Sequence, residues 1–420
     1  MLRYLSVLPL LASSMMGADE PVIYDEAKVP SYTLPDPLRF ENGEPVKTSA
    51  DWPKRRAELL GLFEAHVYGK TPVGRPAGMH FEPRKKIDSF LGGKATLEEI
   101  RIHFREGDDG PFVDVLLIKP AKPAVGGAPA FVGVNFTGNH GVHPSTEITL
   151  STAWMRESNE PEKKGQVIDH RSTEASRGNQ ASRWPLAMIV DAGCALATFY
   201  YGDIDPDFDD GFENGIHALF GKPGPAEWGS IGAWAWGASR VMDYLETDPA
   251  IDSKKVAVMG HSRLGKTALW AGAQDERFAM VISNNSGCGG AALSRRRFGE
   301  RVGRINTSFP HWFADTFHQY NENEAALPVD QHQLIALIAP RLVYVASAVE
   351  DEWADPRGEF LSAVHAGPVY ELLGKKGLGV KEMPELNAAV GESIRYHIRS
   401  GKHDVTDYDW EQYLKAIAGL

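Results

Sequence analysis

The sequence predicts an α/β fold in which helices flank a doubly wound, mostly parallel β-sheet as a three-layer sandwich. Strand-like runs occur at 113–118, 131–135, 195–200, 256–259, 280–283, 342–347 and 394–398, and several of them are almost continuously apolar, as expected of strands buried on both faces. Helix-like stretches, notably 228–245 and 264–273, alternate with them. Since no repeat and no low-complexity linker divides the pattern, we expect residues 53–420 to form a single domain.

The first residues have the layout of a secretory signal peptide. Arg3 precedes an apolar stretch at 4–11, small residues continue to Ala18, and the acidic Asp19 and Glu20 follow. We expect residues 1–18 to be removed and the protein to be secreted or periplasmic. The alternative is a hydrophobic leader that stays attached.

The segment after the predicted signal peptide contains several prolines. Pro30, Pro35 and Pro37 disfavour regular structure, so residues 19–52 are predicted to form an extended N-terminal arm packed on the domain. Pro53 suits the first turn of a helix. A helix is predicted there because apolar residues recur at helical spacing, at Leu59, Leu60, Leu62, Phe63 and Val67.

Composition and charge exclude several classes of protein. The 420 residues are 43% hydrophobic, enough for a large core, and no run in the mature part is apolar enough to span a membrane. The formal net charge of −12 argues against nucleic acid as a partner, and we expect the short basic cluster at 295–297 to be a solvated turn or an ion-pairing edge. Cys194 and Cys288 are expected to be two separate buried thiols, with a single bridge as the alternative.

An acidic segment has the composition of a calcium loop, with Asp203, Asp205, Asp207, Asp209 and Asp210. An EF-hand loop needs glycine at its sixth position, and counting from Asp203 that position is Phe208. We therefore expect a solvated acidic loop, and the sequence implies no metal and no organic cofactor.

The strongest functional signal is a nucleophile elbow at Ser262. The predicted strand at 256–259 runs into Gly260, His261 and Ser262 and continues directly as a helix. Such a turn lifts the serine above the sheet at a helix N-terminus that favours an oxyanion, and Gly260 leaves the crowded side of the turn without a Cβ. The sequence thus predicts an α/β-hydrolase fold with Ser262 as nucleophile. The alternative is a serine that caps an ordinary helix.

Residues 260–266, G-H-S-R-L-G-K, resemble the G-[CH]-S-R-x-G-K motif of glucuronoyl esterases, carbohydrate esterase family 15. Further blocks that resemble this family follow in the family's order at 285–290, 297–300, 309–313, 330–333 and 350–355. The resemblance covers most of the mature chain and implies a catalytic domain of the bacterial type that hydrolyses carboxylic esters.

A serine hydroxyl needs an imidazole as general base, and in α/β-hydrolases the order along the chain is serine, acid, histidine. Among 14 histidines, His403 is predicted to be the base because it lies near the C-terminus in a loop where Gly401 permits a turn. His397 is the rival, but it falls in the predicted last strand, where a satisfied sheet histidine is expected. His261 flanks the nucleophile and is expected to shape the elbow.

The triad acid is expected just after the strand at 342–347, where Glu350, Asp351 and Glu352 lie. Its task is to fix the tautomer of the histidine and to stabilise the imidazolium. We choose Asp351 because the resemblance implies an acid at this place in bacterial members, and Glu350 and Glu352 stay as alternatives. Many fungal members carry a glutamate in the block that begins here with Asn285, which cannot serve as an anion.

Four more residues are predicted to contact the oxyanion or the substrate. Arg263 follows the nucleophile, so its backbone NH should face the oxyanion, and the resemblance implies that its guanidinium does too. The resemblance also implies that Lys266, Glu300 and Trp353 hold the glucuronoyl ring. The structural alternatives are a solvated lysine and a tryptophan that only packs.

The function that the resemblance implies is hydrolysis of esters of glucuronic or 4-O-methyl-glucuronic acid, such as lignin–glucuronoxylan linkages, through an acyl-enzyme on Ser262. One alternative is an acetyl xylan esterase or other carbohydrate esterase of the same fold. Another is an inactive carbohydrate-binding relative that uses Trp353 as a sugar platform, but the set of Ser262, Asp351 and His403 speaks against it. The expected partner is a glucuronate ester, without nucleic acid or membrane, and the protein is expected to be a monomer.

Overall fold

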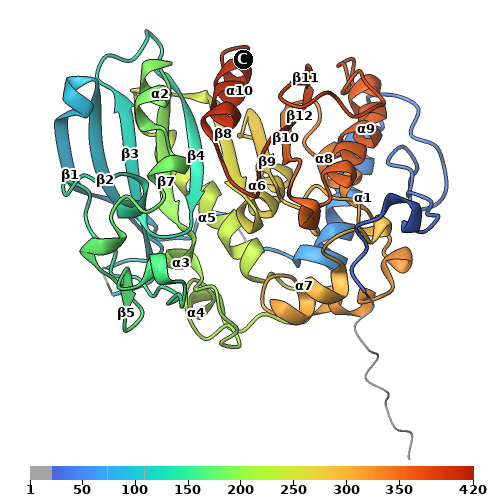
Figure 1. Ribbon diagram of the computed structural model, residues 1–420, viewed down its shortest axis with the longest axis horizontal. Coiled ribbons are helices and arrows are strands. Elements are labelled where there is room, and N and C mark those ends of the chain that lie inside the picture. Colours follow the sequence, from blue (N-terminus) through green and yellow to red (C-terminus); the bar gives the residue numbers. More distant parts are fainter. Residues whose placement is uncertain (1–20, 73, 108) are drawn as a thin grey trace, which may run out of the picture.

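A computed structural model describes residues 21–72, 74–107 and 109–420, so the predicted signal peptide lies outside the described residues. A ten-stranded sheet runs across the molecule in the order β1-β2-β3-β7-β4-β8-β9-β10-β12-β11 (Figure 1). The strands from β7 through to β12 in this order are parallel, whereas β1, β2, β3 and β11 pair antiparallel with their neighbours. The strands of this sheet are β1 His80–Phe90, β2 Ala95–His103, β3 Phe112–Pro120, β4 Ala128–Asn135, β7 Ala195–Tyr200, β8 Ile251–His261, β9 Met280–Asn284, β10 Leu342–Ala348, β11 Val390–Gly391 and β12 Ile394–Arg399. A separate small hairpin pairs β5 Val167–Ile168 with β6 Arg171–Ser172.

Helices cover both faces of the sheet, which confirms the three-layer α/β fold predicted from the sequence. Apolar side chains of α1, α5, α6, α8 and α9 belong to the core on one face, and those of α2 and α10 belong to the core on the other (Figure 1). The helices span α1 Trp52–Phe63, α2 Leu186–Asp191, α3 Tyr201–Ile204, α4 His217–Phe220, α5 Ser230–Leu245, α6 Arg263–Gln274, α7 Val302–Ser308, α8 Gln331–Ala336, α9 Pro356–Leu372 and α10 Asp407–Ile417.

The antiparallel strands β1 and β2 were not predicted from the sequence. The reason is that β1 lies at the edge of the sheet, where most of its side chains are exposed or half-buried. It carries the charged run of Arg84, Lys85 and Lys86, and its pairing with β2 shifts register between Pro83 and Lys85 and again between Ile87 and Phe90. At the opposite edge of the sheet, β11 is only two residues long.

The arm at 21–51 includes the short 3-10 helix η1 (Glu26–Lys28) and contacts the domain through backbone and charge. The amide of Gly299 donates a hydrogen bond of 2.8 Å to the carbonyl of Ile23. The guanidinium of Arg296 forms an ion pair of 2.6 Å with Glu26. These contacts hold the arm next to the loop that leads to Glu300.

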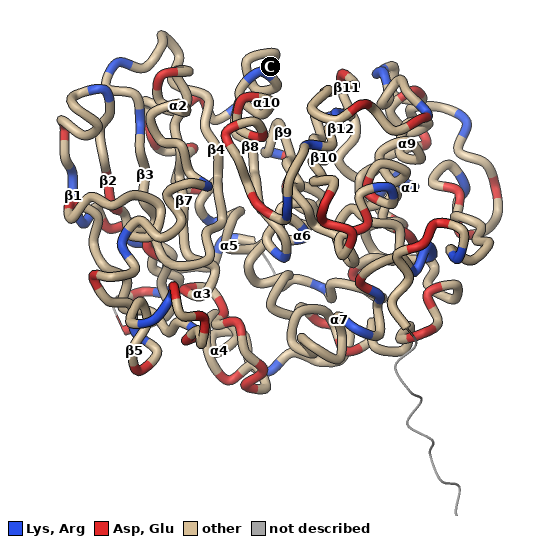
Figure 2. Tube along the Cα trace, in the orientation of Figure 1, with Lys and Arg blue, Asp and Glu red and all other residues tan. Residues whose placement is uncertain are grey.

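Cys194 and Cys288 are both free and buried, as expected. The basic cluster at 295–297 forms ion pairs, since Arg295 contacts Asp330 at 3.2 Å and Arg296 contacts Asp355 at 2.8 Å. Figure 2 shows acidic and basic residues interspersed along the trace. Among the described residues, none of the helices combines the length and the apolar character needed to cross a membrane.

Candidate active site

The residues predicted for catalysis follow the carboxyl ends of three parallel strands. Ser262 comes directly after β8, Asp351 comes after β10 and His403 comes after β12. Because these strands are parallel, their carboxyl ends lie at one edge of the sheet. Open α/β sheets bind their ligands at this edge.

The backbone at Ser262 has the strained conformation of a nucleophile elbow. Its φ of 59° and ψ of −128° lie in a region that residues other than glycine rarely adopt. Helix α6 begins at the next residue, and the amide of Ser262 donates a hydrogen bond of 2.9 Å to the carbonyl of Asn284 on β9. A Cβ at Gly260 would lie 1.9 Å from the carbonyl oxygen of Leu264, so the turn requires glycine there.

His403 and Asp351, the predicted base and acid, lie in hydrogen-bond contact. The Nδ1 atom of His403 lies 2.6 Å from Oδ2 of Asp351, and the same oxygen accepts a hydrogen bond of 2.9 Å from Nδ2 of Asn285. Burial alone would raise the pKa of Asp351, but its hydrogen bond with His403 and the charge of His403 outweigh burial and lower the pKa. Glu350 and Glu352 are both exposed. The carboxylate that contacts His403 is therefore Asp351.

Ser262 and His403 line one cavity of about 610 Å³. Its wall also contains Arg263, Phe136 and Tyr201, together with other residues from the loops that follow β4 and β7. The cavity is large enough for a sugar-sized ligand. The serine, its expected base and the predicted oxyanion residue therefore face one common space.

Arg263 is held beside Ser262 by an acidic partner that sequence reasoning missed. Its NH1 atom forms an ion pair with Asp207, which also accepts a hydrogen bond of 2.7 Å from the indole of Trp312 and lies 2.9 Å from Nε2 of His311. The guanidinium carbon lies 4.8 Å from the centroid of the Trp312 ring. Burial opposes ionisation of Asp207, but the hydrogen bond with His311 and the charge of Arg263 lower its pKa below the ordinary value.

The expectation of a solvated acidic loop at 203–210 is therefore wrong for two of its aspartates. Asp205 and Asp207 are 3% and 1% exposed. The carboxylate of Asp205 accepts a hydrogen bond of 2.5 Å from the hydroxyl of Ser230 and lies 3.0 Å from Nδ1 of His217. Several of their partners, namely Ser230, Arg263, His311 and Trp312, stand 25 to 105 residues away in sequence, so a local acidic pattern could not reveal the burial. Among the described residues, no group of three or more His, Cys, Asp or Glu side chains could hold a metal ion.

Replacing Asp207 by asparagine should lower the free energy of unfolding at pH 7 by on the order of 3 kcal/mol, because Arg263 would keep its charge in a largely buried place without a counterion. Since the pKa of Asp207 is lowered on folding, the stabilisation is present above pH ~4 and is lost as the pH falls through the folded-state pKa. Urea unfolding curves measure the difference. Asp209→Asn, at an exposed neighbour, is the control, with an expected change within about 0.5 kcal/mol. An equally small change for Asp207→Asn would contradict the assignment.

The residues predicted to hold the sugar ring, Lys266, Glu300 and Trp353, form a cluster. None of the three lines the cavity that Ser262 and His403 line. Lys266 is buried rather than solvated, donates a hydrogen bond of 2.6 Å to the carbonyl of Ser286, and lies 3.9 Å from a carboxylate oxygen of Glu300. Burial raises the pKa of Glu300, while the charge of Lys266 and a hydrogen bond from the Trp353 side chain oppose that rise. Trp353 is 37% exposed. Their roles toward a substrate remain predictions.

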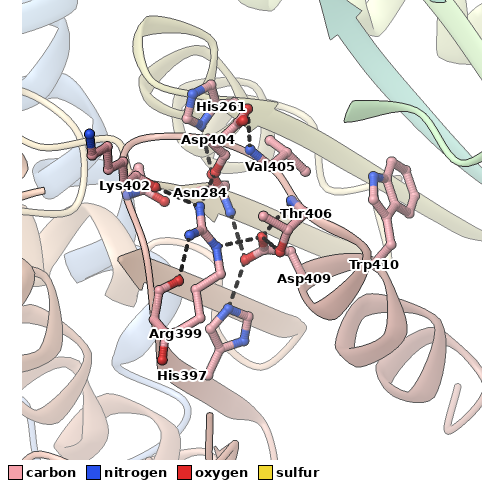
Figure 3. Close-up of polar contacts among 12 residues, drawn as sticks. His261, Asn284, His397, Arg399, Lys402, Asp404, Val405, Thr406, Asp409 and Trp410 are labelled. Carbon is pink, nitrogen blue, oxygen red and sulfur yellow. Dashed lines mark hydrogen bonds and ion pairs between the residues drawn. The ribbon is translucent and has the colours of Figure 1, made fainter. Parts of the chain in front are cut away.

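A buried ion pair between Arg399 and Asp409 stabilises the loop that carries His403 (Figure 3). Arg399, the last residue of β12, donates hydrogen bonds of 3.0 Å each to the carbonyls of Ser400 and Lys402 and a third to the carbonyl of Asp404. Its Nε atom donates a hydrogen bond of 2.7 Å to Asp409 on α10. The rival His397 is buried in β12, with its two ring nitrogens 2.9 Å from Asp409 and 2.9 Å from the hydroxyl of Tyr344. His397 is therefore the satisfied sheet histidine that was expected.

Comparisons with known proteins show which proteins this chain is similar to. The family model for "Glucuronyl esterase, fungi" matches residues 179–374. The chain is 50% identical over 429 residues to the carbohydrate esterase MZ0003 of an unknown prokaryotic organism, with 99% of this chain and 98% of the relative covered. It is 28% identical to 4-O-methyl-glucuronoyl methylesterase 1 of Wolfiporia cocos, with 82% and 74% covered. The solved structure of a glucuronoyl esterase from Solibacter usitatus is similar with a TM-score of 0.87 at 50% identity, over 93% of this chain and 99% of that one.

Proposed function

Since the chain belongs to the glucuronoyl esterase family, carbohydrate esterase family 15, and is a carboxylic ester hydrolase, we propose that it hydrolyses esters of glucuronic and 4-O-methyl-glucuronic acid through an acyl-enzyme on Ser262. The observation that carries the proposal is the common cavity of Ser262, Arg263 and His403, with the ring of His403 anchored on Asp351. The relatives named as methylesterases of 4-O-methyl-glucuronate supply the substrate class.

The reaction follows from the chemistry of these side chains. His403 takes the proton of the Ser262 hydroxyl, and the Ser262 oxygen attacks the carboxyl carbon of the ester at C6 of the sugar. The amide of Arg263 at the start of α6 and the positive end of that helix favour the oxyanion, and the guanidinium beside it adds positive charge. His403 then protonates the leaving alcohol. Water activated by the same imidazole releases the uronic acid and restores Ser262.

The cluster of Lys266, Glu300 and Trp353 suits recognition of the sugar ring. The charges of Arg263 and His403 both lower the pKa of Glu300, which indicates that the cluster adjoins the predicted catalytic residues. A buried carboxyl group can exchange hydrogen bonds with sugar hydroxyls, and the exposed indole of Trp353 offers an apolar face. We infer that this cluster distinguishes a uronic acid from a simple acyl group.

Three esters test the proposal. Methyl glucuronate should be hydrolysed with a kcat/KM higher by about tenfold or more than that for methyl galacturonate, because an inverted hydroxyl leaves buried polar groups unpaired. Release of acetate from acetylated xylan should be slower still. Initial rates measured with all three esters at equal enzyme concentration give the comparison. Preferential release of acetate would instead support an acetyl xylan esterase, and inactivity toward all three esters would remove the proposed function.

We further propose that the enzyme is exported and acts on glucuronoxylan esters linked to lignin alcohols outside the cytoplasm. The support is the layout of residues 1–18, with a basic start, an apolar stretch and small residues before Asp19. Expression of residues 1–420 in a secreting bacterium should give a mature protein that begins at Asp19, as measured by intact mass. Recovery of the uncleaved chain only from the cytoplasm would contradict the export.

A further inference from the structure

A second histidine packs against the expected general base. The ring centroids of His261 and His403 lie 4.3 Å apart, with an angle of 44° between the ring planes. We propose that His261 and Asn284 are positioning residues for His403, because the buried carboxylate of Asp409, acting through Asn284, holds His261 as a neutral imidazole against the catalytic ring. The inference rests on the proposed function in one respect, the assignment of His403 as the base of acyl transfer.

The chain of contacts starts from a fully buried anion, Asp409. Its Oδ2 atom accepts hydrogen bonds from Nε of Arg399 at 2.7 Å and from the amide and hydroxyl of Thr406 at 2.8 Å each. Its Oδ1 atom lies 2.9 Å from Nε2 of His397 (Figure 3). With these donors Asp409 stays a carboxylate, and an ionised carboxylate can only accept hydrogen bonds. The group that faces Asp409 from Asn284 must therefore be a donor.

This requirement fixes the side-chain amide of Asn284. Its Nδ2 atom donates to Oδ1 of Asp409 at 3.1 Å and to the hydroxyl oxygen of Tyr413 at 2.9 Å. The carbonyl oxygen of the amide consequently faces the other way, and it lies 2.6 Å from Nδ1 of His261 (Figure 3). An amide oxygen only accepts, so Nδ1 of His261 carries the proton. The charge of Asp409 thereby sets the tautomer of a histidine that it does not touch.

The other ring nitrogen of His261 lies where a second proton is disfavoured, so the ring stays neutral. Its Nε2 atom is buried and has no hydrogen-bond partner among the described side chains. Burial, with the charges of His403 and Arg183 next in importance, lowers the pKa of His261 well below its ordinary value. A neutral ring can remain beside His403 when His403 becomes an imidazolium during the reaction, whereas a protonated His261 would repel it.

Asn284 also connects the two halves of the catalytic machinery. Its backbone carbonyl accepts the hydrogen bond from the amide of Ser262, and its side chain reaches Asp409, which organises the loop of His403 through Arg399. The expected nucleophile and the loop of the expected base are thus both connected to Asn284, a buried residue that does not line the cavity. Loss of its side chain should disturb the approach of His403 to Ser262 and leave substrate binding unchanged.

The experiment compares Asn284→Leu with Tyr413→Phe as the matched control. Leucine has a similar volume but no amide, while Asp409 keeps its other donors. Phenylalanine at 413 removes the second acceptor of the same amide and leaves the line from Asp409 to His261 intact. For reaction of Ser262 with a fluorophosphonate, we expect Asn284→Leu to lower kinact by about tenfold or more, since small misplacement of reacting groups has large effects on rate. KI should stay within about twofold, and Tyr413→Phe should leave both constants within about twofold of the wild type.

A spectroscopic readout separates positioning from general loosening of the fold. The low-field proton resonance of the His403 to Asp351 hydrogen bond should be retained in Tyr413→Phe and shifted or broadened in Asn284→Leu. An unchanged kinact in a folded Asn284→Leu variant, or a change in KI alone, overturns the proposal. If that variant does not fold, His261→Phe decides, because it keeps a packed ring but lacks the Nδ1 donor: a loss of kinact supports the proposal, and retention within about twofold overturns it.

The probe keeps the two proposals distinguishable. A fluorophosphonate reports on Ser262 and His403 without any sugar. Failure to hydrolyse methyl glucuronate, with a kinact that still depends on Asn284, would remove the proposed substrate and leave the positioning role in place.

Discussion

Ser262→Ala should give a folded protein that no longer hydrolyses methyl glucuronate, with kcat lower by on the order of 10⁴- to 10⁶-fold. The hydroxyl removed is the group that we propose forms the acyl-enzyme, and the remaining cavity could only bind and polarise the ester. Alanine keeps the same Cβ at the strained φ of 59°, so the free energy of unfolding should change by less than about 1 kcal/mol. Initial rates and urea unfolding curves measure the two quantities.

Two controls accompany this variant. Ser308→Ala, at an exposed serine that ends α7, should retain the wild-type kcat. Labelling by a fluorophosphonate should be lost in Ser262→Ala and retained in Ser308→Ala. A Ser262→Ala protein that still turned over the ester at an appreciable fraction of the wild-type rate would take the nucleophile's role away from Ser262.

The second large effect is expected for Asp351→Asn. Asparagine can donate a hydrogen bond to Nδ1 of His403, which favours the wrong tautomer, and it brings no charge to stabilise the imidazolium. By analogy with the same change in a serine protease triad, kcat should fall by about 10⁴-fold while KM changes little. Asn285, which donates a hydrogen bond to Asp351, cannot restore the charge, because its side chain is a neutral amide.

The neighbouring carboxylates are the matched controls for this prediction. Glu350→Gln and Glu352→Gln remove one charge each from the same loop at exposed positions and should retain kcat within about threefold. Comparison of kcat for the three variants assigns the acid. A loss for Glu350→Gln or Glu352→Gln as large as that for Asp351→Asn would contradict the assignment made from the 2.6 Å contact with His403.

The fold could be predicted from the sequence where burial leaves a simple pattern. Residues 195–200 coincide with β7 because a strand covered on both faces is apolar throughout, and 256–259 lies inside the longer β8 for the same reason. The elbow was visible because glycine and serine must stand at fixed positions between a strand and a helix. β1 and β2 were missed because their sequences are mixed in polarity, with most side chains of β1 exposed or half-buried and those of β2 alternating between buried and half-buried.

The residues of the candidate site could be selected from the sequence only where chain order carries information. Ser262, Asp351 and His403 stand in the order that the fold imposes, so one histidine could be selected among many. Asp207 could not be found, since its partners Arg263 and Trp312 lie 56 and 105 residues away, and nothing local separates it from the exposed Asp209. Asn284 and Asp409 are 125 residues apart and meet only when α10 packs against the sheet.

The two ends of the sheet bear on how separate molecules behave at high concentration. An unpaired strand is a template on which a second chain can add its own backbone, and this is a common start of aggregation. Here one end is β1, which carries two register shifts and a run of charged side chains, and the other end is the two-residue β11. Neither offers a long flat edge, so the large sheet that presents the catalytic residues also resists joining to a copy of itself.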